Sequence, residues 1–450
     1  MGKLFGTDGL RAKAGEFPLD NGTTELLGRI LFFLLQDRHI TPELIVGRDT
    51  RESGPNILKA LCRGFGGAGG KIDDAGILPT PAVAFLARAE QKCAVSITAS
   101  HNAYPDNGIK IFGPDGYKIS EQSESEIEPF LLGEKTFTRN SLPSNSVDPV
   151  PLEQYFRSRY SGYLASDLFP DLNLRGMRIA LDCAHGALFQ IAPAILRQME
   201  AEVVAFNVEP NGKNINDHCG SLHPKFLFEQ LQQGNFDYGF TFDGDGDRCL
   251  FGDREAMYDG DYILAAAACF LQKRGELKKN AVVATSMSNL GLEIFLKRYG
   301  ITLHRVPVGD KYVLEKLQEE DLSLGGEQSG HIIFMNDTFV GDGLLTALQL
   351  LRIHKASGVP FTEFWQGFRK FPQILLNVHV QKKPELEAVP EIQKKIRSIE
   401  QELVESGRIV VRYSGTEMLA RIMIEGPDQH QIEQRAAELA EIIRRNLSYV

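Results

Sequence analysis

The chain has 450 residues, a formal net charge of -10 and hydrophobic residues at 43%. This length exceeds what one hydrophobic core supports, and at about 150 residues per domain it predicts roughly three domains. The acidic balance argues against a general nucleic-acid binder, and the longest apolar runs fall short of the roughly 20 residues that span a membrane.

The first part of the chain alternates short β-rich runs with helix-like stretches. The expected strands are residues 44–46, 72–77, 94–97 and 109–112, with helices at 55–65 and 82–91. This alternation predicts an α/β layer with a mainly parallel sheet. Two later stretches repeat the pattern, with strands at 178–181, 202–206 and 237–242, and at 281–285, 303–306 and 322–324.

The last part of the chain has a different pattern. After about residue 371 we expect a strand, a helix, two strands at 409–413 and 419–425, and an amphipathic helix at 429–445. A stretch rich in Ser, Asn and Pro at 138–151 is typical of a linker. We therefore expect three similar α/β/α domains with mixed sheets (1–140, 152–253 and 254–370) and a C-terminal α+β domain (371–450).

The six cysteines include no C-x-x-C pair. Their spacing predicts neither a zinc ribbon nor a disulfide framework. The first residues also lack the apolar stretch of a signal peptide. We expect reduced, mostly buried thiols in a cytoplasmic protein.

Ser100 is the first candidate for chemistry. It follows the expected strand at 94–97. The short run 107–110, which ends at Lys110, comes next. Ligands bind outside the carboxyl ends of strands in α/β sheets, so a hydroxyl there is well placed to act. The alternative is a serine that caps a helix or a turn. The adjacent His101 does not form a dyad by adjacency, because neighbouring side chains usually point apart.

Three aspartates, Asp243, Asp245 and Asp247, alternate with glycine after the expected strand at 237–242. In a flat strand, residues two apart lie about 6.6 Å from each other, too far to share an ion. The glycines let the backbone curl, and converging carboxylates favour Mg²⁺ or Ca²⁺. An EF-hand counted from Asp243 puts Arg248 where glycine is required, which excludes that motif. A solvated acidic turn is the alternative.

A third loop, residues 325–331, is rich in glycine and follows the expected strand at 322–324. Glu327 and Ser329 offer groups that suit sugar hydroxyls, and His331 belongs to the residue type that titrates near neutrality. An ordinary turn is the alternative.

A fourth loop joins two strands of the C-terminal part. Two guanidinium groups, hydroxyls and backbone N–H groups make a phosphate cradle in an otherwise acidic protein. A hairpin turn with surface arginines is the alternative. The residues concerned are Arg412, Ser414, Gly415, Thr416 and Arg421.

The four loops in this order resemble the α-D-phosphohexomutase superfamily over the whole chain. The resemblance implies four domains around a central cleft, with loops for phosphoserine, metal, sugar and phosphate. It implies that Mg²⁺ is held by Asp243, Asp245, Asp247 and phosphorylated Ser100. The implied catalytic residues are Arg11, Ser100, His101, Lys110 and His331. The implied substrate ligands are Arg248, Glu327, Ser329, Arg412, Ser414, Gly415, Thr416 and Arg421.

Within the superfamily, three stretches resemble the bacterial branch that supplies amino sugar for the cell wall. They are the opening Phe5–Arg11, the run Asn214–Pro224, and Gln328. The resemblance to this branch implies that glucosamine 6-phosphate accepts the Ser100 phosphoryl group on its 1-hydroxyl. The glucosamine 1,6-bisphosphate intermediate then returns its 6-phosphoryl group to Ser100, leaving glucosamine 1-phosphate.

Some expectations concern the working of the enzyme. Lys110 and His331 are candidates for moving the hydroxyl proton, because both side chains can be tuned towards neutral pH. One phosphate cradle serves two substrate orientations, which predicts movement of the C-terminal domain about residue 371. The resemblance also suggests a homodimer, and an activating kinase is one source of the first phosphate on Ser100.

The residues alone are also compatible with other activities. The nearest is the same chemistry on glucose or mannose phosphates. A metal-dependent phosphatase would let water complete the reaction. A phosphosugar-binding or Ca²⁺-binding regulator is disfavoured by the failed EF-hand count and by the number of polar loops.

Overall fold

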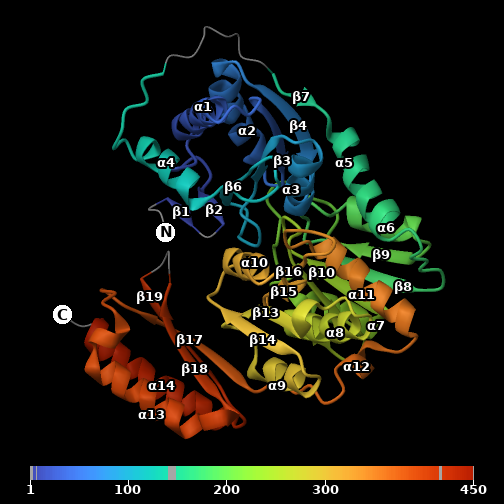
Figure 1. Ribbon diagram of the computed structural model, residues 1–450, viewed down its shortest axis with the longest axis vertical. Helices are drawn as coiled ribbons and strands as arrows, with labels where there is room; N and C mark the ends of the chain where they lie inside the picture. The colour runs from blue at the N-terminus through green and yellow to red at the C-terminus, as the bar shows by residue number, and fades with distance from the viewer. Residues whose placement is uncertain (1–3, 7, 140–147, 415–417, 449–450) are drawn as a thin grey trace.

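The computed structural model describes residues 4–6, 8–139, 148–414 and 418–448, so the predicted phosphate ligands Gly415 and Thr416 lie outside the described residues. Within the described part, four sheets follow one another along the chain, as the colours of Figure 1 show. Three of them are flanked by helices in α/β/α layers, and the fourth is a small sheet with two long helices. The expected fold class is confirmed.

The first sheet is mixed, with strand order β1-β2-β6-β5-β3-β4-β7. β3 is parallel to β4 and β5, whereas β6 is antiparallel to both β5 and β2. Two of the three pairings among the predicted strands are therefore parallel, as expected, and only β6 departs from the pattern, because the short connection from β5 to β6 has no room for a crossover helix. The strands are β1 (Phe5–Gly6), β2 (Gly9–Lys13), β3 (Glu43–Arg48), β4 (Lys71–Ile77), β5 (Cys93–Ile97), β6 (Asp106–Phe112) and β7 (Val150–Pro151).

Helices cover this sheet, and the end of the expected linker joins it as an edge strand. β7 pairs with β4, so residues 150 and 151 belong to the first sheet. The helices are α1 (Asn21–Asp37), α2 (Gly54–Phe65), α3 (Thr80–Ala89) and α4 (Glu121–Leu131), with a 3₁₀ turn η1 (Gly66–Ala68).

The second sheet has a parallel centre and an antiparallel edge. β10 is parallel to β8 and antiparallel to β11, in the order β12-β11-β10-β8-β9. The elements are α5 (Glu153–Gly162), the π-helical η2 (Tyr163–Leu168), β8 (Arg178–Asp182), α6 (Ile191–Gln198), β9 (Glu202–Phe206), α7 (Pro224–Gln233), β10 (Tyr238–Phe242), β11 (Cys249–Gly252) and β12 (Met257–Tyr258).

The third sheet has the order β14-β13-β15-β16, with only β15 and β16 antiparallel. The expected strand at 322–324 begins two residues later, and Gly325 lies close under Val313 and Leu317 of α10. The elements are α8 (Gly260–Lys273), η3 (Lys278–Asn280), β13 (Ala281–Thr285), α9 (Leu290–Arg298), β14 (Thr302–Val306), α10 (Asp310–Glu319), β15 (Leu324–Gly326), β16 (Ile332–Phe334), α11 (Gly343–Ser357) and α12 (Phe361–Phe364).

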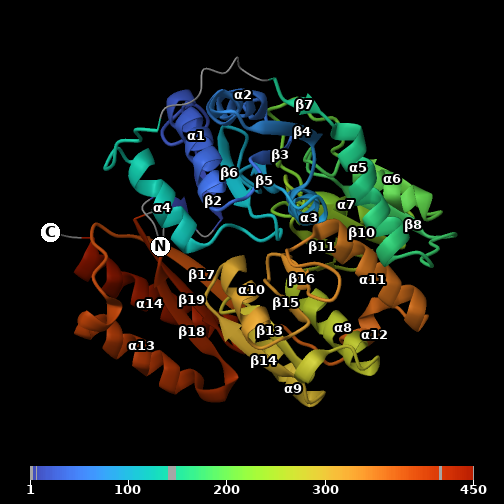
Figure 2. The ribbon, with the colours of Figure 1, turned by 45° about the horizontal axis from the view of Figure 1, so that its top comes forward.

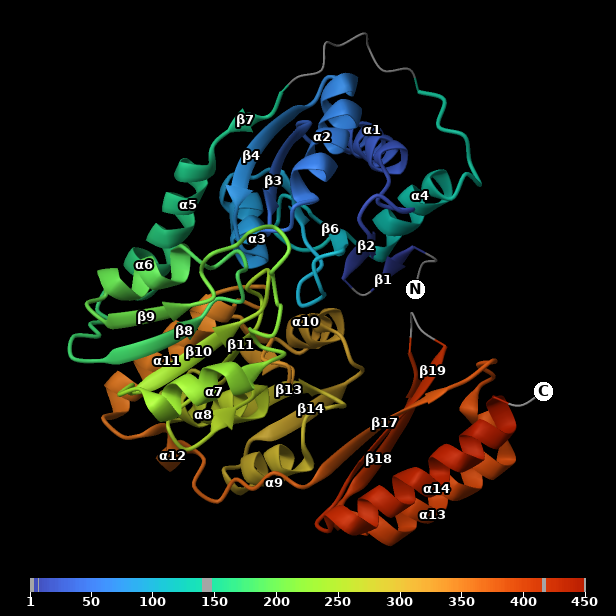
Figure 3. The ribbon, with the colours of Figure 1, turned by 180° about the vertical axis from the view of Figure 1, so that it is seen from behind.

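The fourth sheet is antiparallel throughout, in the order β17-β19-β18. Figure 3 shows α13 and α14 lying together along one side of it. The elements are β17 (Gln373–His379), η4 (Leu386–Ala388), α13 (Pro390–Leu403), η5 (Val404–Ser406), β18 (Arg408–Tyr413), β19 (Leu419–Glu425) and α14 (Gln429–Leu447).

Several helices begin at a side chain that accepts a backbone N–H from the first turn. Such caps satisfy amide groups that otherwise lack partners, and each is worth about 1 kcal/mol. They explain why these helices start where they do. The capping residues of α1, α8, α9, α11 and α14 are Asp20, Asp259, Asn289, Asp342 and Asp428.

The hydrophobic interior consists of several clusters of buried side chains. One cluster of buried side chains runs through the first three domains, from Ile45 through Phe240 to Leu348. The C-terminal domain has a cluster of its own, which includes Val378 and Leu439. Because its core is separate, the C-terminal domain is the unit best suited to rotate as a body.

The six cysteines are all free; five are buried and Cys269 is half-buried. Burial raises the pKa of every one of these thiols. Among the described residues, no helix combines the length and the apolar character needed to cross a membrane.

Candidate active site

Three of the predicted loops follow central strands of the first three sheets. Ser100 follows β5, the three aspartates connect β10 to β11, and Glu327 lies between β15 and β16. Figure 2 shows these strands grouped around the middle of the molecule, with the C-terminal sheet beside them. The three loops therefore lie at the strand ends where the rule places ligands in α/β sheets.

Ser100 is buried and lies next to the aspartate cluster. Its Oγ donates a hydrogen bond to Asp243 Oδ2 at 2.7 Å, and its side chain comes from another domain than its partner. The expectation that His101 points away is wrong, since His101 Nδ1 lies 3.3 Å from Ser100 Oγ. The left-handed backbone at Ser100, with φ of 51°, makes this approach possible. Burial, Arg248 and Arg11 lower the pKa of His101 to about 3, so the ring is neutral.

Arg51, which the motif search missed, holds the Ser100 loop from within its own domain. Its side chain is fully buried and pairs with Asp49 at 2.9 Å. The guanidinium donates to four carbonyl oxygens of the loop, those of Ser100, Asn102, Ala103 and Asp106. Arg51 comes shortly after β3, which is a neighbour of β5, so the strand-end rule that found Ser100 also points to Arg51.

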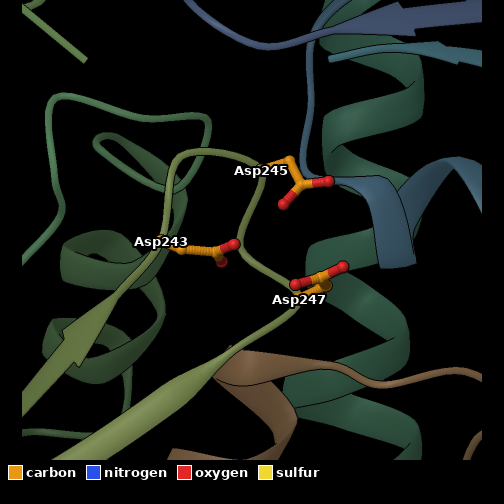
Figure 4. A group of neighbouring side chains, drawn as sticks. All are labelled: Asp243, Asp245 and Asp247. Atoms are coloured by element: carbon orange, nitrogen blue, oxygen red, sulfur yellow. The ribbon is translucent and has the colours of Figure 1, made fainter. Parts of the chain in front are cut away.

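The three aspartates converge as predicted, and Figure 4 shows their carboxylates turned toward one another. One oxygen from each lies within 4.8 Å of the others. Asp245 Oδ1 and Asp247 Oδ1 are buried without a hydrogen-bond partner. Buried carboxylate oxygens normally have a partner, so these two atoms and the close spacing fit an oxygen-loving cation.

Burial and neighbouring charges shift the pKa values of Asp243 and Asp247 in opposite directions. Burial and the charges of Asp247 and Asp245 hold the pKa of Asp243 well above its usual range. Burial also acts to raise the pKa of Asp247, but Lys110, His331 and Arg248 outweigh it and hold that pKa well below its usual range. One carboxyl of the three is thus the weakest acid, as expected when like charges crowd together.

Lys110 is buried against the aspartates. Its Nζ lies 2.9 Å from Asp245 Oδ2, 3.3 Å from Asp247 Oδ2 and 2.9 Å from Asp8 Oδ2. Burial lowers the pKa of Lys110, but these carboxylates outweigh it and hold the pKa well above its ordinary value. The expectation of a lysine tuned towards neutral pH is wrong, because three anions stabilise the cation.

His331 is a second buried cation beside the cluster. Its Nδ1 lies 3.7 Å from Asp247 Oδ2, and its Nε2 lies 4.0 Å from Asp310 Oδ2. Burial lowers the pKa of His331, but Asp247 and Asp310 outweigh it and raise the pKa to about 9. Gly341 packs against the ring, where any Cβ would overlap the imidazole.

Charged side chains from three domains form a closed ring. Lys118 lies 2.6 Å from Asp310, Asp310 approaches His331, and His331 approaches Asp247. Asp247 then pairs with Lys110, Lys110 with Asp8, and Asp8 with Lys118. Asp8 also pairs with the predicted Arg11, which β2 carries. We call the six-membered set Lys118, Asp310, His331, Asp247, Lys110 and Asp8 the charge ring.

The loop at residues 325–331 is held by hydrogen bonds to the side chain of Glu327. Glu327 Oε1 accepts from Gly309 N at 3.1 Å, and Glu327 Oε2 accepts from Ser329 Oγ at 3.2 Å.

Arg248 N donates to Asp243 Oδ1 at 3.1 Å, and Arg248 Nε lies 3.8 Å from Asp247 Oδ1. Arg248, predicted as a substrate ligand, therefore contacts two of the three aspartates.

The described part of the predicted phosphate cradle brings together basic side chains from both strands of a hairpin. Arg412 on β18 stands opposite Arg421 on β19, and Arg421 Nη2 lies 3.5 Å from Ser414 Oγ. Lys383 Nζ donates to Ser414 O at 2.7 Å, a cation that the sequence search missed because it lies outside the loop. Burial and Arg421 lower the pKa of Arg412, as expected for two like charges placed together.

Models of one protein family match the chain in four consecutive stretches. They are described as domains I, II and III and the C-terminal domain of phosphoglucomutase/phosphomannomutase. The matched residues are 2–136, 154–256, 259–371 and 375–442.

Curated relatives match along nearly their whole length. A phosphoglucosamine mutase of Syntrophotalea carbinolica is 40% identical over 99% of this chain and 98% of its own. A phosphoglucosamine mutase of Koribacter versatilis is 42% identical over 98% of this chain and 96% of its own.

Solved structures share the fold at lower identity. A phosphoglucomutase/phosphomannomutase family protein of Burkholderia thailandensis has a TM-score of 0.79 and 21% identity, covering 98% of this chain and 99% of its own. N-acetylphosphoglucosamine mutase of Aspergillus fumigatus, solved with GlcNAc-6P and magnesium, has a TM-score of 0.69 and 18% identity, covering 98% and 95%.

Proposed function

The chain belongs to the phosphoglucosamine mutases of the phosphoglucomutase/phosphomannomutase family, and from this premise we propose how its residues interconvert glucosamine 6-phosphate and glucosamine 1-phosphate. The observation that carries the proposal is the hydrogen bond from Ser100 Oγ to Asp243 Oδ2 at 2.7 Å. It joins a hydroxyl of one domain to a cation site of another. A phosphosugar mutase needs this pairing, because its phosphoryl carrier must react next to concentrated positive charge.

The metal is proposed to be Mg²⁺. Asp243, Asp245 and Asp247 would hold it together with an oxygen of phosphorylated Ser100. The buried Oδ1 atoms of Asp245 and Asp247, which lack a hydrogen-bond partner, support this assignment. When bound, Mg²⁺ supplies charge stabilisation to the transferred phosphoryl group.

In the proposed reaction, the bond between Ser100 Oγ and phosphorus breaks as phosphorus bonds to O1 of glucosamine 6-phosphate. The proton of the 1-hydroxyl ends on Ser100 Oγ. The bound 1,6-bisphosphate then turns over and returns its 6-phosphoryl group to Ser100, so no phosphate is released. Lys110 and Arg248 lie beside the aspartates and would offset the charge of the phosphoryl group.

The remaining site residues have proposed binding roles. Glu327 and Ser329 would contact the sugar, and Arg412 and Arg421 would hold the phosphate that does not react. Arg11, His101 and His331 would position groups or carry protons near Ser100. A homodimer, an activating kinase and a cytoplasmic location stay predictions.

Substitution of Ser100 tests the proposal. We expect Ser100→Ala to lower kcat for glucosamine 1-phosphate by about 10³-fold or more, because the phosphoryl carrier is lost. Ser125→Ala, an exposed serine of α4, is the matched control and should keep wild-type turnover. Full activity in Ser100→Ala would overturn the proposal.

Two further measurements define the substrate and the carrier. Peptide mapping after incubation with glucose 1,6-bisphosphate should place the phosphate on Ser100 and nowhere else. Turnover of glucosamine, glucose and mannose 1-phosphates, compared as kcat/KM, should favour glucosamine. A preference for glucose or mannose would support the alternative substrate class instead.

A further inference from the structure

The run Asn214–Pro224, so far assigned no role, lies between the Ser100 loop and the metal loop. Asn216 Nδ2 donates to Ser100 O at 2.9 Å and to Asn102 O at 3.1 Å. Asn216 belongs to the second domain, whereas both acceptors belong to the first. Its side chain is buried, so these hydrogen bonds are shielded from water.

The same run also contacts the metal loop. Ser221 N donates to Phe242 O at 2.8 Å, directly before Asp243. Ile215 packs so closely on Gly244 that a Cβ added to Gly244 would come within 2.7 Å of Ile215 Cδ1. Movement of this run would therefore disturb both loops.

The conformation of Asn216 matches its contacts. Its φ is 59°, in the left-handed region that asparagine tolerates better than most residues, and its N donates to Ala184 O at 2.9 Å. A primary amide supplies two N–H donors, one for each of the two carbonyl oxygens. An aspartate of the same shape would present only acceptors to them.

Asn216 and Arg51 hold the same two carbonyl groups from opposite sides of the domain boundary. Arg51 Nη2 lies 3.0 Å from Ser100 O and 2.8 Å from Asn102 O. The left-handed backbone at Ser100 is costly for a residue with a Cβ, by about 1–2 kcal/mol, and persists only when the surroundings fix it. Arg51 fixes it within its own domain, and Asn216 fixes it relative to the metal loop.

We propose that Asn216 is a positioning residue for phosphoryl transfer, holding the main chain of Ser100 at the metal loop so that Ser100 Oγ stays beside the aspartates. This inference rests on the proposed function, because it gives Asn216 a part in the phosphoserine steps. It assigns the loop-contacting residues of the run, Ile215, Asn216 and Ser221, to the alignment of two catalytic loops and not to sugar recognition.

Steady-state kinetics on the full chain test this inference. We compare Asn216→Ala and Asn216→Asp with Asn214→Ala, a matched control whose Nδ2 donates to Glu209 O within its own exposed loop. We expect kcat to fall about 10- to 100-fold in Asn216→Ala, as for a small misplacement of a reacting group, and further in Asn216→Asp. KM for glucosamine 1-phosphate should change less than twofold, and the control should keep wild-type kcat and KM.

A second readout separates positioning from general damage. The rate at which glucose 1,6-bisphosphate phosphorylates Ser100, followed by intact-protein mass spectrometry, should fall in parallel with kcat while the thermal midpoint stays within a few degrees. If Asn216→Asp does not fold, Asn216→Ala and Asn216→Ser carry the test.

Several results would overturn the inference. They are wild-type kcat in the Asn216 variants, a rise in KM without loss of kcat, and an equal loss of kcat in Asn214→Ala. Absence of turnover in the wild-type protein would contradict the proposed function itself. Loss confined to the Asn216 variants supports the inference.

Discussion

Asp342 is a buried carboxyl whose charge is unfavourable where it stands. It caps α11 by accepting from Leu345 N at 2.9 Å, and it accepts from Tyr160 OH at 2.7 Å. Burial raises its pKa from the ordinary 3.8 to about 6, against the effect of these hydrogen bonds. The residue thus joins α5 to α11 most favourably in its neutral form.

The pH dependence of stability should reveal this carboxyl. The pKa of Asp342 is higher in the folded protein than in the unfolded chain. Between about pH 4 and pH 6 the folded protein therefore holds a proton that the unfolded chain has released, and the free energy of unfolding falls as pH rises. In Asp342→Asn the free energy of unfolding should fall less over this pH range, by up to roughly 2–3 kcal/mol. Urea unfolding at pH 4.5 and pH 7 measures it; the same pH dependence in both proteins would contradict the assignment.

At the scale of elements, the loop from β10 to β11 depends on glycine. Gly246 has φ of 72°, and a Cβ there would come within 2.8 Å of Leu188 Cδ1 and 3.0 Å of Pro79 Cβ. Both neighbours are packed, so the loop itself would have to move. The curl that brings the aspartates together therefore depends on the absence of a side chain.

A pair of alanine substitutions tests this dependence. Gly246→Ala should lower the free energy of unfolding by about 2–3 kcal/mol and weaken Mg²⁺ binding, since backbone strain and overpacking add. Gly300→Ala is the control, because Gly300 has a similar φ of 68° but nothing within 4 Å of an added Cβ. It should cost about 1 kcal/mol and leave calorimetric Mg²⁺ binding unchanged. Equal effects would show that packing is irrelevant.

The same loops show what a single sequence can predict. Asp243 comes directly after a hydrophobic strand and Ser100 three residues after another, so strand pattern and residue type locate them without knowledge of the fold. The contact between Asn216 and Ser100 joins residues 116 apart in sequence and depends on how two domains pack. The pKa of Lys110 was mispredicted for the same reason, since two of its three carboxylate partners come from the second domain.

At the scale of the whole molecule, the charge ring joins three domains around the site. Its link between Lys118 and Asp310 connects the first domain to the third. Both side chains of this pair are half-buried, with 27% and 21% of their surface exposed, so removing one member leaves the other charge partly desolvated without that partner. The ring therefore resists separation of these domains.

A double-mutant cycle measures that link. Lys118→Met and Asp310→Leu should each lower the free energy of unfolding by about 2 kcal/mol, as for the loss of a hydrogen bond between charged groups, and the double variant should lose less than the sum of the two. The exposed pair Lys278–Asp321, 2.7 Å apart, is the control and should show coupling under about 1 kcal/mol. Additive losses at Lys118 and Asp310 would contradict the coupling.

Five buried thiols and the half-buried Cys269, all with raised pKa values, make the molecule suitable for site-specific labelling. Labelling reagents react with the thiolate form, so buried thiols with a raised pKa are labelled slowly. Residues 371–450 contain no cysteine. A cysteine introduced at the exposed position Leu375 on β17 would be the fast-reacting thiol of the protein. A fluorophore there could follow reorientation of the C-terminal domain during turnover, with every native cysteine left in place.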